Sequence, residues 1–399
     1  MKKITPEVEA FARIKVIGVG GSGRNAVNHM INSKVKGVEF VVVNTDAQDL
    51  HNSLAKKKIH VGKNLTRGLG TGMNPELGRR AAEETKEEIQ EVIKGSDMVF
   101  IACGYGGGTG TGASPIVAKT ARESGALTVA IVTKPFSFEG VQRMQIADHG
   151  LEDLRREVDA IIIVPNDRLL AIVEKETSML NAFAICDEVL KNAVEGISDL
   201  ITTPGIINVD FADIRSIMKN AGDALMGIGI STGDTRAQDA ARAAINSPLL
   251  EIDITGAKGV LFAVAGGDDL TMLEVQEAAK VITESIDPNA KVIFGAIRDD
   301  KLKKGEVKVT CIASGFPEGG IKKSLFSDEP DMQPLMKKEQ RQKGKIYNDI
   351  SSPSQSAPVS NSIEPAPVAK PEIKKEIAPA EEEDDDWGVV PAFLRRNKK

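Results

Sequence analysis

The chain has 399 residues, of which 41% are hydrophobic, so it is long enough for more than one domain with a core of its own. Its formal net charge of −6 gives no overall indication of a nucleic-acid or anionic-membrane surface. Cys103, Cys186 and Cys311 stand far apart without metal-ligand spacing, which is typical of buried thiols in a reducing compartment. The sequence has no apolar stretch of membrane-spanning length and no signal-peptide pattern, so we expect a cytoplasmic protein.

The first half of the chain alternates short apolar runs with segments of helical pattern. The runs of strand length are Ile14–Val19, Phe40–Val43, Met98–Ala102, Leu127–Val132 and Ala160–Val164. Strands that alternate with helices pair in parallel, and helices cover both faces of their sheet. We therefore predict a Rossmann-like α/β domain with a parallel sheet.

A long helical pattern follows, from residue 177 to residue 201. Its apolar band is wide, so we expect this helix to be buried on most sides, between two domains. After Pro204-Gly205 the pattern changes to that of a smaller α+β domain. Its expected helices are 213–220, 238–245 and 270–286, and its expected strands are 259–265, 291–297 and 306–313.

The composition changes again beyond residue 316. Residues 351–380 contain six of the eighteen prolines together with many Ser, Ala, Lys and Glu, a composition that buries too little apolar surface to offset the entropy of ordering. We expect a disordered linker over 317–386, which ends in the acidic run Glu381–Asp386. Residues 387–399 mix apolar and basic side chains, as is typical of a short recognition segment on a flexible tether.

The most informative motif is Gly106–Gly112, which reads GGGTGTG between an apolar run and a helical pattern. Glycines let consecutive backbone N–H groups point into one concavity, and a helix that follows adds the N–H groups and the dipole of its first turn. The hydroxyls of Thr109 and Thr111 can donate to phosphate oxygens or hold a metal-bound water. The motif predicts a phosphate-binding loop rather than a turn without a ligand.

A second glycine loop, Gly18–Gly23, follows the first predicted strand and fits the pattern G-x-G-x-x-G. Alone it would favour a dinucleotide-binding oxidoreductase in which Asp46 binds the ribose. Two phosphate loops at neighbouring strands suit a nucleoside triphosphate better, and a third loop, Gly68–Glu76, is placed to reach the terminal phosphate. A P-loop NTPase is disfavoured because the sequence contains no G-x-x-x-x-G-K-[ST].

Several segments, in this order and spacing, resemble the FtsZ family of bacterial tubulin-like division GTPases: Gly20–Asn28, Asn44–Asp46, Gly106–Gly112, Thr133–Gly140 and Asn208–Asp213. The resemblance covers about residues 10–316 and the last dozen residues. It implies a tubulin/FtsZ-like fold, GTP and GDP as ligands, Mg²⁺ as cofactor, and head-to-tail filaments that form the Z-ring at the division site. The chain would then divide into a flexible N-terminus (1–12), a GTP-binding domain (13–176), a central helix (177–203), a C-terminal domain with the catalytic loop (204–316), the linker (317–386) and a partner-binding peptide (387–399).

The resemblance also implies a set of GTP-binding residues, with no protein side chain expected to ligate the metal. They are Gly20, Gly21, Ser22, Gly23, Arg24, Asn25, Asn44, Gly70, Gly72, Gly106, Gly107, Gly108, Thr109, Gly110, Thr133, Pro135, Glu139, Arg143, Asn166, Phe183 and Asp187.

At the base, Asp187 is a carboxylate in apolar surroundings on the predicted long helix. It can accept the N1–H and the N2 amine of guanine, a pair of donors that adenine lacks, which would favour GTP over ATP. Its alternative role is a surface ion pair with Lys191. Phe183, one turn earlier, would stack on the base or belong to the core, and Glu139 with Arg143 would alone indicate a surface pair at i,i+4.

Asn208, Asp210 and Asp213 are the residues that the resemblance assigns to catalysis. Two carboxylates near the γ-phosphate can orient and polarise the attacking water. The same spacing also fits an N-cap followed by an acid in the first helical turn. Because the long helix places these acids opposite the phosphate loops, we expect each subunit to complete the site of its neighbour, through a heterologous contact that gives open filaments.

Some residues depart from the family's usual pattern: Ser22, Arg24, Thr71, Met73 and Tyr105. Arg24 would add charge beside the nucleotide and so change its affinity or hydrolysis. The tail resembles the family segment that binds membrane-tethering division proteins and assembly regulators, through Pro391, Ala392, Phe393, Leu394 and Arg395, although Val389-Val390 differs from the usual pair. No nucleic-acid partner and no direct membrane insertion are expected, and a non-enzymatic scaffold is the alternative class of function.

Overall fold

A computed structural model describes residues 12–170, 178–203, 205–247, 254–299 and 301–316. The described residues all lie within Met1–Glu329. The predictions for residues 1–11, for the linker 317–386 and for the tail residues Pro391, Ala392, Phe393, Leu394 and Arg395 lie outside the described residues.

The described strands form one ten-stranded sheet in the order β3-β2-β1-β4-β5-β6-β7-β10-β8-β9. The strands from β1 to β6 pair in parallel, β7 joins β6 through three parallel residue pairs, and β10 runs antiparallel to β7 and β8. The strands are β1 (Ile14–Val19), β2 (Val38–Asn44), β3 (Lys57–His60), β4 (Met98–Gly104), β5 (Leu127–Lys134), β6 (Ala160–Pro165), β7 (Gly222–Thr232), β8 (Gly259–Gly266), β9 (Lys291–Arg298) and β10 (Glu306–Ser314).

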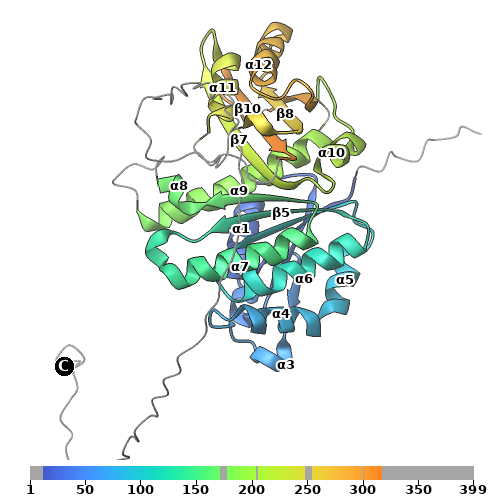
Figure 1. Cartoon of the computed structure of the whole chain (residues 1–399), viewed down its shortest axis with the longest axis vertical. Helices are drawn as coiled ribbons and strands as arrows, with labels where there is room; N and C mark the ends of the chain where they lie inside the picture. The colour runs from blue at the N-terminus through green and yellow to red at the C-terminus, as the bar shows by residue number, and fades with distance from the viewer. Residues whose placement is uncertain (1–11, 171–177, 204, 248–253, 300, 317–399) are drawn as a thin grey trace, which may run out of the picture. The chain divides into compact units, whose positions relative to one another are not determined.

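Helices cover both faces of the parallel part of the sheet (Figure 1). Successive residues of β1 point to opposite faces: Val16 belongs to the core cluster that includes residues of α1 and α9, and Ile17 belongs to the cluster that includes residues of α4, α5, α6 and α7. The helices are α1 (Gly20–Asn32), α2 (Ala47–His51), α3 (Lys63–Thr66), α4 (Pro75–Glu84), α5 (Lys86–Ile93), α6 (Thr109–Glu123), α7 (Val141–Glu157), α8 (Asn166–Leu170), α9 (Met179–Thr202), α10 (Phe211–Met218), α11 (Arg236–Ile245) and α12 (Met272–Glu284).

The helix α9 is the continuous element between the two predicted regions. Its buried side chains share one core cluster with residues of the parallel strands, such as Val129, and with residues of β7 and β8, such as Met226 and Leu261. A separate cluster around Phe262 fills the space between α11, α12 and the last strands. The predicted α/β fold with a mostly parallel sheet is therefore confirmed, and the helix predicted over 177–201 is observed over Met179–Thr202.

Two strands are absent from the sequence prediction. The short edge strand β3 is Lys57-Lys58-Ile59-His60, which has too little apolar pattern to indicate a strand. In β7, Gly227 and Gly229 interrupt the β-branched pattern because α11 packs directly on them, and a Cβ atom at either would clash with a backbone carbonyl of that helix.

The cysteines agree with the expectation of buried thiols. Cys103, Cys186 and Cys311 are buried and free, and burial raises the pKa of each to about 12. Within the described part of the chain, no helix is both long and apolar enough to cross a membrane.

Candidate functional site

A cavity of about 370 Å³ lies at the carboxyl ends of β1, β4 and β5, where the two predicted phosphate loops meet. Gly20 has a φ of +74°, and a Cβ atom there would lie only 2.9 Å from the backbone nitrogen of Gly110. Position 20 therefore needs glycine for the loops to approach each other. In an open α/β sheet this edge is where ligands bind.

Both loops lead into helices whose first N–H groups have no side-chain cap. The residue before α1 is Val19 and the residue before α6 is Gly108, and neither provides a capping oxygen. The helix α6 begins at Thr109, so the second half of the glycine run forms its first turn rather than preceding it. Two uncapped helix N-termini that face one cavity provide backbone donors and positive dipole ends for phosphate oxygens.

Three buried threonine hydroxyls join the cradle to its neighbouring loops. The hydroxyl of Thr109 lies 2.8 Å from that of Thr45, which follows β2, and 3.2 Å from that of Thr71 in the third glycine loop. Gly70 and Gly72 of the third loop do not line the cavity, and no atom lies within 4 Å of a Cβ atom built on either. The third loop thus contacts the cradle through Thr71 rather than through its glycines.

One wall of the cavity belongs to α9, which contributes Phe183, Cys186, Asp187 and Leu190. Burial raises the pKa of the Asp187 carboxyl to about 6. Lys191 does not pair with Asp187, because its ammonium group lies 2.7 Å from Glu188 and 3.7 Å from Glu195. The surface-pair alternative for Asp187 is therefore wrong, and its carboxylate faces the cavity.

The opposite wall holds an ion pair and a buried amide. Glu139 and Arg143 are 2.6 Å apart, and the other Glu139 oxygen accepts a hydrogen bond from the backbone nitrogen of Phe136. Among the described residues, the side-chain oxygen of Asn166 is buried without a hydrogen-bond partner. Because Asn166 lines the cavity, this oxygen is a spare acceptor for a donor on a ligand.

Most of the predicted nucleotide residues lie together around this cavity. The predicted residues that line it are Gly20, Gly21, Ser22, Asn25, Gly107, Gly108, Thr109, Gly110, Thr133, Pro135, Glu139, Arg143, Asn166, Phe183 and Asp187. Val19, Gly104, Tyr105, Cys186 and Leu190 also line it, although no sequence pattern marks them as ligand-binding residues. The Tyr105 hydroxyl lies 2.8 Å from Ser114, and burial holds its pKa well above the usual value.

Four other predicted residues do not line the cavity and have structural contacts instead. Gly23 lets α1 pack against the sheet, because a Cβ atom there would clash with the carbonyl of Ala102. Gly106 has a φ of +91°, and its nitrogen donates to the Thr111 hydroxyl. Arg24 forms an ion pair with Asp49, and Asn44 donates to the same carboxylate.

The predicted catalytic loop follows the C-terminal end of α9, and none of its three residues lines the cavity. The side-chain oxygen of Asn208 accepts a hydrogen bond of 2.7 Å from the nitrogen of Gly205, so Asn208 holds the loop itself. Asp210 is the N-cap of α10, and Asp213 is exposed in the first turn of that helix. The N-cap geometry predicted as an alternative is therefore present.

Family models match this chain over most of its described length. The GTPase domain of the Tubulin/FtsZ family matches residues 13–174, and the C-terminal domain of the FtsZ family matches residues 222–317. A solved FtsZ from M. jannaschii, titled an empty dimer, is 47% identical with a TM-score of 0.74, over 77% of this chain and 89% of that chain. A tryptophan-to-tyrosine mutant of M. jannaschii FtsZ is also 47% identical, over 77% of this chain and 92% of that chain, with a TM-score of 0.74. CetZ2 from Haloferax volcanii, titled a GTPgS-bound protofilament, is 21% identical with a TM-score of 0.66, over 77% of this chain and 94% of that chain, and supports the fold alone.

The fold and the cavity define a GTPase of the tubulin/FtsZ class, a class of cytoskeletal proteins. Within that class, the chain belongs to the FtsZ family. As a GTPase of this family, the chain binds GTP and GDP.

Proposed function

We propose that this chain is a cell-division GTPase that assembles head-to-tail and hydrolyses GTP where two subunits meet. One observation carries the proposal: the α9 residues that line the cavity lie in the N-terminal half of this helix, whereas Asp210 and Asp213 follow its C-terminal end. At the usual helical rise, roughly 20 Å of helix separates Asp187 from the last turn of α9. The acids would therefore reach a nucleotide held by the neighbouring subunit rather than their own.

In this proposal the phosphates bind to the backbone N–H groups of the two glycine loops, and the guanine base lies between Phe183 and Asp187. The exposed carboxylates of Asp210 and Asp213 would orient the attacking water and accept its proton. Asn208 would position the loop through its bond to Gly205. Because phosphoryl transfer depends mainly on positioning and electrostatics, two carboxylates and a preorganised cradle supply what the reaction needs from the protein.

Mg²⁺ is the cofactor that a GTPase of this kind would use. The described residues contain no group of three or more His, Cys, Asp or Glu side chains arranged around a common metal position. The phosphates and water molecules would therefore be the main ligands, with the hydroxyl of Thr109, which lines the cavity, available to such waters. Bound there, Mg²⁺ supplies neutralisation of the charge on the β- and γ-phosphates.

The shared site is tested by mixing two inactive variants. D210A keeps the cavity and lacks an acid, whereas Asp187→Ala keeps the acids and lacks the base contact. If the site is shared, each alone hydrolyses almost no GTP, and the mixture exceeds the sum of the two because the cavity of one variant meets the acids of the other. Turnover per wild-type subunit should also rise with protein concentration.

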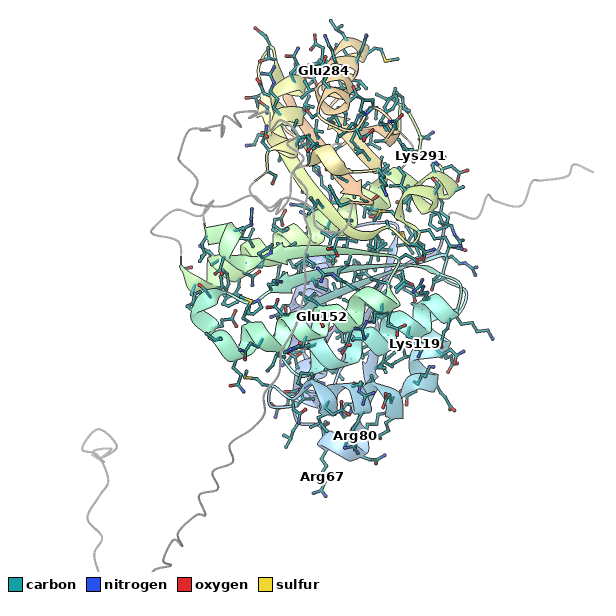
Figure 2. All side chains as sticks on the ribbon, in the orientation of Figure 1. Arg67, Arg80, Lys119, Glu152, Glu284 and Lys291 are labelled. Carbon is teal, nitrogen blue, oxygen red and sulfur yellow. The ribbon has the colours of Figure 1, made fainter. Side chains whose placement is uncertain are left out.

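The matched control for Asp210 is Glu152→Ala, which removes an exposed carboxylate on α7 (Figure 2) that does not line the cavity. It should hydrolyse GTP at the wild-type rate. A mixture with no gain over its components, together with turnover that is independent of concentration, would contradict the shared site. A pure scaffold would assemble equally well in all variants, without a dependence on Asp210.

Family membership also supports a place for these filaments in the cell. We propose that they lie in the cytoplasm at the division site, as the Z-ring, and that Pro391, Ala392, Phe393, Leu394 and Arg395 recruit membrane-tethering division proteins and assembly regulators. Truncation after residue 386 should leave GTP hydrolysis unchanged and abolish localisation of a fluorescent fusion to the septum. Septal localisation of the truncated protein would argue against recruitment through the tail.

A further inference from the structure

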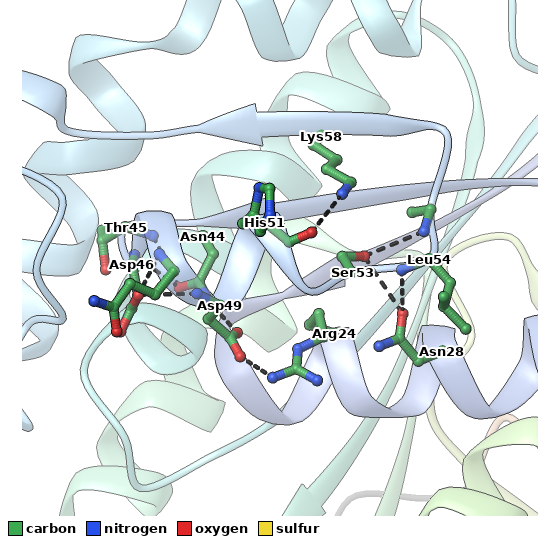
Figure 3. A network of polar contacts seen from close by, with 12 residues as sticks. Arg24, Asn28, Asn44, Thr45, Asp46, Asp49, His51, Ser53, Leu54 and Lys58 are labelled. Carbon is green, nitrogen blue, oxygen red and sulfur yellow. Dashed lines mark hydrogen bonds and ion pairs between the residues drawn. The ribbon is translucent and has the colours of Figure 1, made fainter.

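Beside the phosphate loops lies a network that the GTP-binding role does not account for, made of Arg24, Asn44 and Asp49 (Figure 3). We propose that Arg24 is a positioning residue that acts through Asp49. It fixes the turn after β2 against α1, and it cancels a negative charge next to the phosphates, so that the site favours GTP over GDP. This inference rests on the proposed binding of the phosphates to the glycine loops.

The network connects the two sides of the phosphate site. Asp49, on α2, pairs with Arg24 of α1 through one oxygen and accepts a 2.6 Å hydrogen bond from the Asn44 amide through the other. The Asn44 oxygen in turn accepts from the backbone nitrogens of Thr45, at 2.8 Å, and Asp46, at 3.4 Å. Figure 3 shows these groups as one chain of contacts from α1 to the turn.

This turn touches the cradle itself. The Thr45 hydroxyl lies 2.8 Å from the hydroxyl of Thr109, the first residue of α6. The backbone nitrogen of Ala47 donates to the carbonyl of Gly68, so the third glycine loop is attached to the same turn. A shift of Asp49 would therefore move groups on both loops that adjoin the phosphates.

The charge of Asp49 makes its pairing with Arg24 necessary. A Cβ atom built on Gly21, which lines the cavity, would lie 3.7 Å from an Asp49 oxygen, so this carboxylate stands directly beside the first phosphate loop. The Asp49 and Arg24 side chains are only 18% and 22% exposed, so water screens their charges weakly. Without Arg24, the carboxylate would repel the phosphates, and it would repel GTP more than GDP because GTP carries the additional phosphate charge.

Arg24 also acts electrostatically on Asp187. Comparing the affinities for GTP and GDP separates this effect from the effect of Arg24 through Asp49. Electrostatic interactions with His29 and with Arg24 partly offset the rise that burial causes in the pKa of Asp187 on α9. Asp187 faces the base, which GTP and GDP share. Loss of the effect of Arg24 on Asp187 would therefore weaken the binding of both nucleotides equally. The ratio of GTP to GDP affinity therefore reports the effect at the phosphates alone.

The test measures the dissociation constants of GTP and GDP by calorimetry at low salt for the wild type, R24Q, D49N and the double variant. R24Q should lower the preference for GTP over GDP about tenfold, as expected for one unpaired charge several ångströms from the phosphates. D49N, which removes the negative charge and leaves Arg24, should raise this preference. The preference of the double variant for GTP over GDP should lie between those of R24Q and D49N.

R24K keeps the charge and should keep the wild-type preference. R79Q is the matched control, since Arg79 also forms ion pairs, with Glu76 and Glu83, but does so on the exposed surface of α4. It should leave both affinities unchanged.

Shifts of R24Q and D49N in the same direction, or an unchanged ratio in R24Q, would overturn the inference. Thermal melting of the nucleotide-free variants checks that they are folded. If R24Q is not folded, the direction in which D49N changes the preference for GTP over GDP decides the test. Failure of the wild type to bind GTP would instead refute the proposed function.

Discussion

The ring of Phe183 meets Phe136 edge to face, with centroids 5.4 Å apart and ring planes at 85°. Phe136 is buried and also stacks on Phe138, so it holds the Phe183 ring in place from the protein side. The Phe183 residue itself remains 41% exposed. Phe183 lines the cavity between the glycine loops and α9, as does Asp187. A ring held in this way can stack on a flat base at little cost in side-chain entropy.

Phe183→Ala is therefore expected to weaken GTP binding about tenfold or more, since stacking of a base on an aromatic ring contributes ~1–3 kcal/mol. Calorimetric titration with GTP measures the effect. Phe138→Ala is the control, because Phe138 stacks on the same Phe136 without lining the cavity. Equal losses in the two variants would mean that Phe183 acts through the aromatic cluster and not on the base.

A second prediction concerns pH. The Asp187 carboxylate must be ionised to accept two guanine N–H groups, and its pKa in the nucleotide-free protein is about 6. GTP affinity should therefore fall about tenfold between pH 7.5 and pH 5, because only about a tenth of the carboxyls are ionised one unit below the pKa. Nucleotide phosphates also titrate in this range, so the quantity to measure is the difference between the wild type and Asp187→Asn. Parallel pH profiles for the two would contradict the proposed role of Asp187.

The same raised pKa predicts the opposite effect on the stability of the nucleotide-free protein. A carboxyl whose folded pKa lies above its unfolded value contributes stability that is present below about pH 4 and is lost as the pH rises through about 6. Asp187→Asn removes the ionised group, so it should raise the melting temperature at pH 7.5 and change it little at pH 4. A lower melting temperature at pH 7.5 would show that the carboxylate stabilises the empty site.

Arg236 provides a prediction for the C-terminal region. Its side chain is 8% exposed and joins α11 to the start of α12, at 2.7 Å from Asp269 and 2.6 Å from Glu274. Arg236→Met should cost about 3–5 kcal/mol of unfolding free energy, because it leaves charged partners without a counterion. Arg79→Met, at a 49% exposed arginine that also bridges two carboxylates, should cost at most about 1 kcal/mol. Urea unfolding measures both, and similar losses would show that burial does not decide the strength of these pairs.

Glycine packing gives a further prediction. A Cβ atom at Gly229 would clash with the backbone of α11, so Gly229→Ala should separate that helix from β7 and lower the melting temperature strongly. Gly70→Ala, where no atom lies within 4 Å of the added methyl, should leave the melting temperature of the nucleotide-free protein nearly unchanged. A fully stable Gly229→Ala protein would mean that the two elements can slide apart at little cost.

The sequence is informative where local chemistry determines the structure. Apolar runs between glycine loops are sufficient to predict the parallel strands β1, β2, β4, β5 and β6, and the glycines themselves indicate the two loops that line the cavity. The prediction fails at β7, where Gly227 and Gly229 are explained only by α11, a helix later in the chain. Similarly, no local pattern reveals that Asp49 pairs with Arg24, because the two lie on different helices.

The sequence motif alone assigns Arg24 to the nucleotide, whereas in the structure Arg24 pairs with Asp49. A basic residue inside a phosphate-loop motif suggests a phosphate contact, and only the position of Asp49 shows where its charge is directed. Asn44 is assigned from its motif in the same way, although its amide is engaged by Asp49. Motif positions therefore identify the neighbourhood of the site, while the partners of each side chain depend on the tertiary fold.

The loop before Asp210 has one more property. β9 is an edge strand, and Ile207 pairs with Ala296 on its free side, where the nitrogen and the oxygen of Ala296 both form backbone hydrogen bonds to Ile207. An exposed edge is a template on which foreign strands can add, a route to amyloid-like aggregation. By covering part of this edge, the loop limits the addition of foreign strands to the sheet.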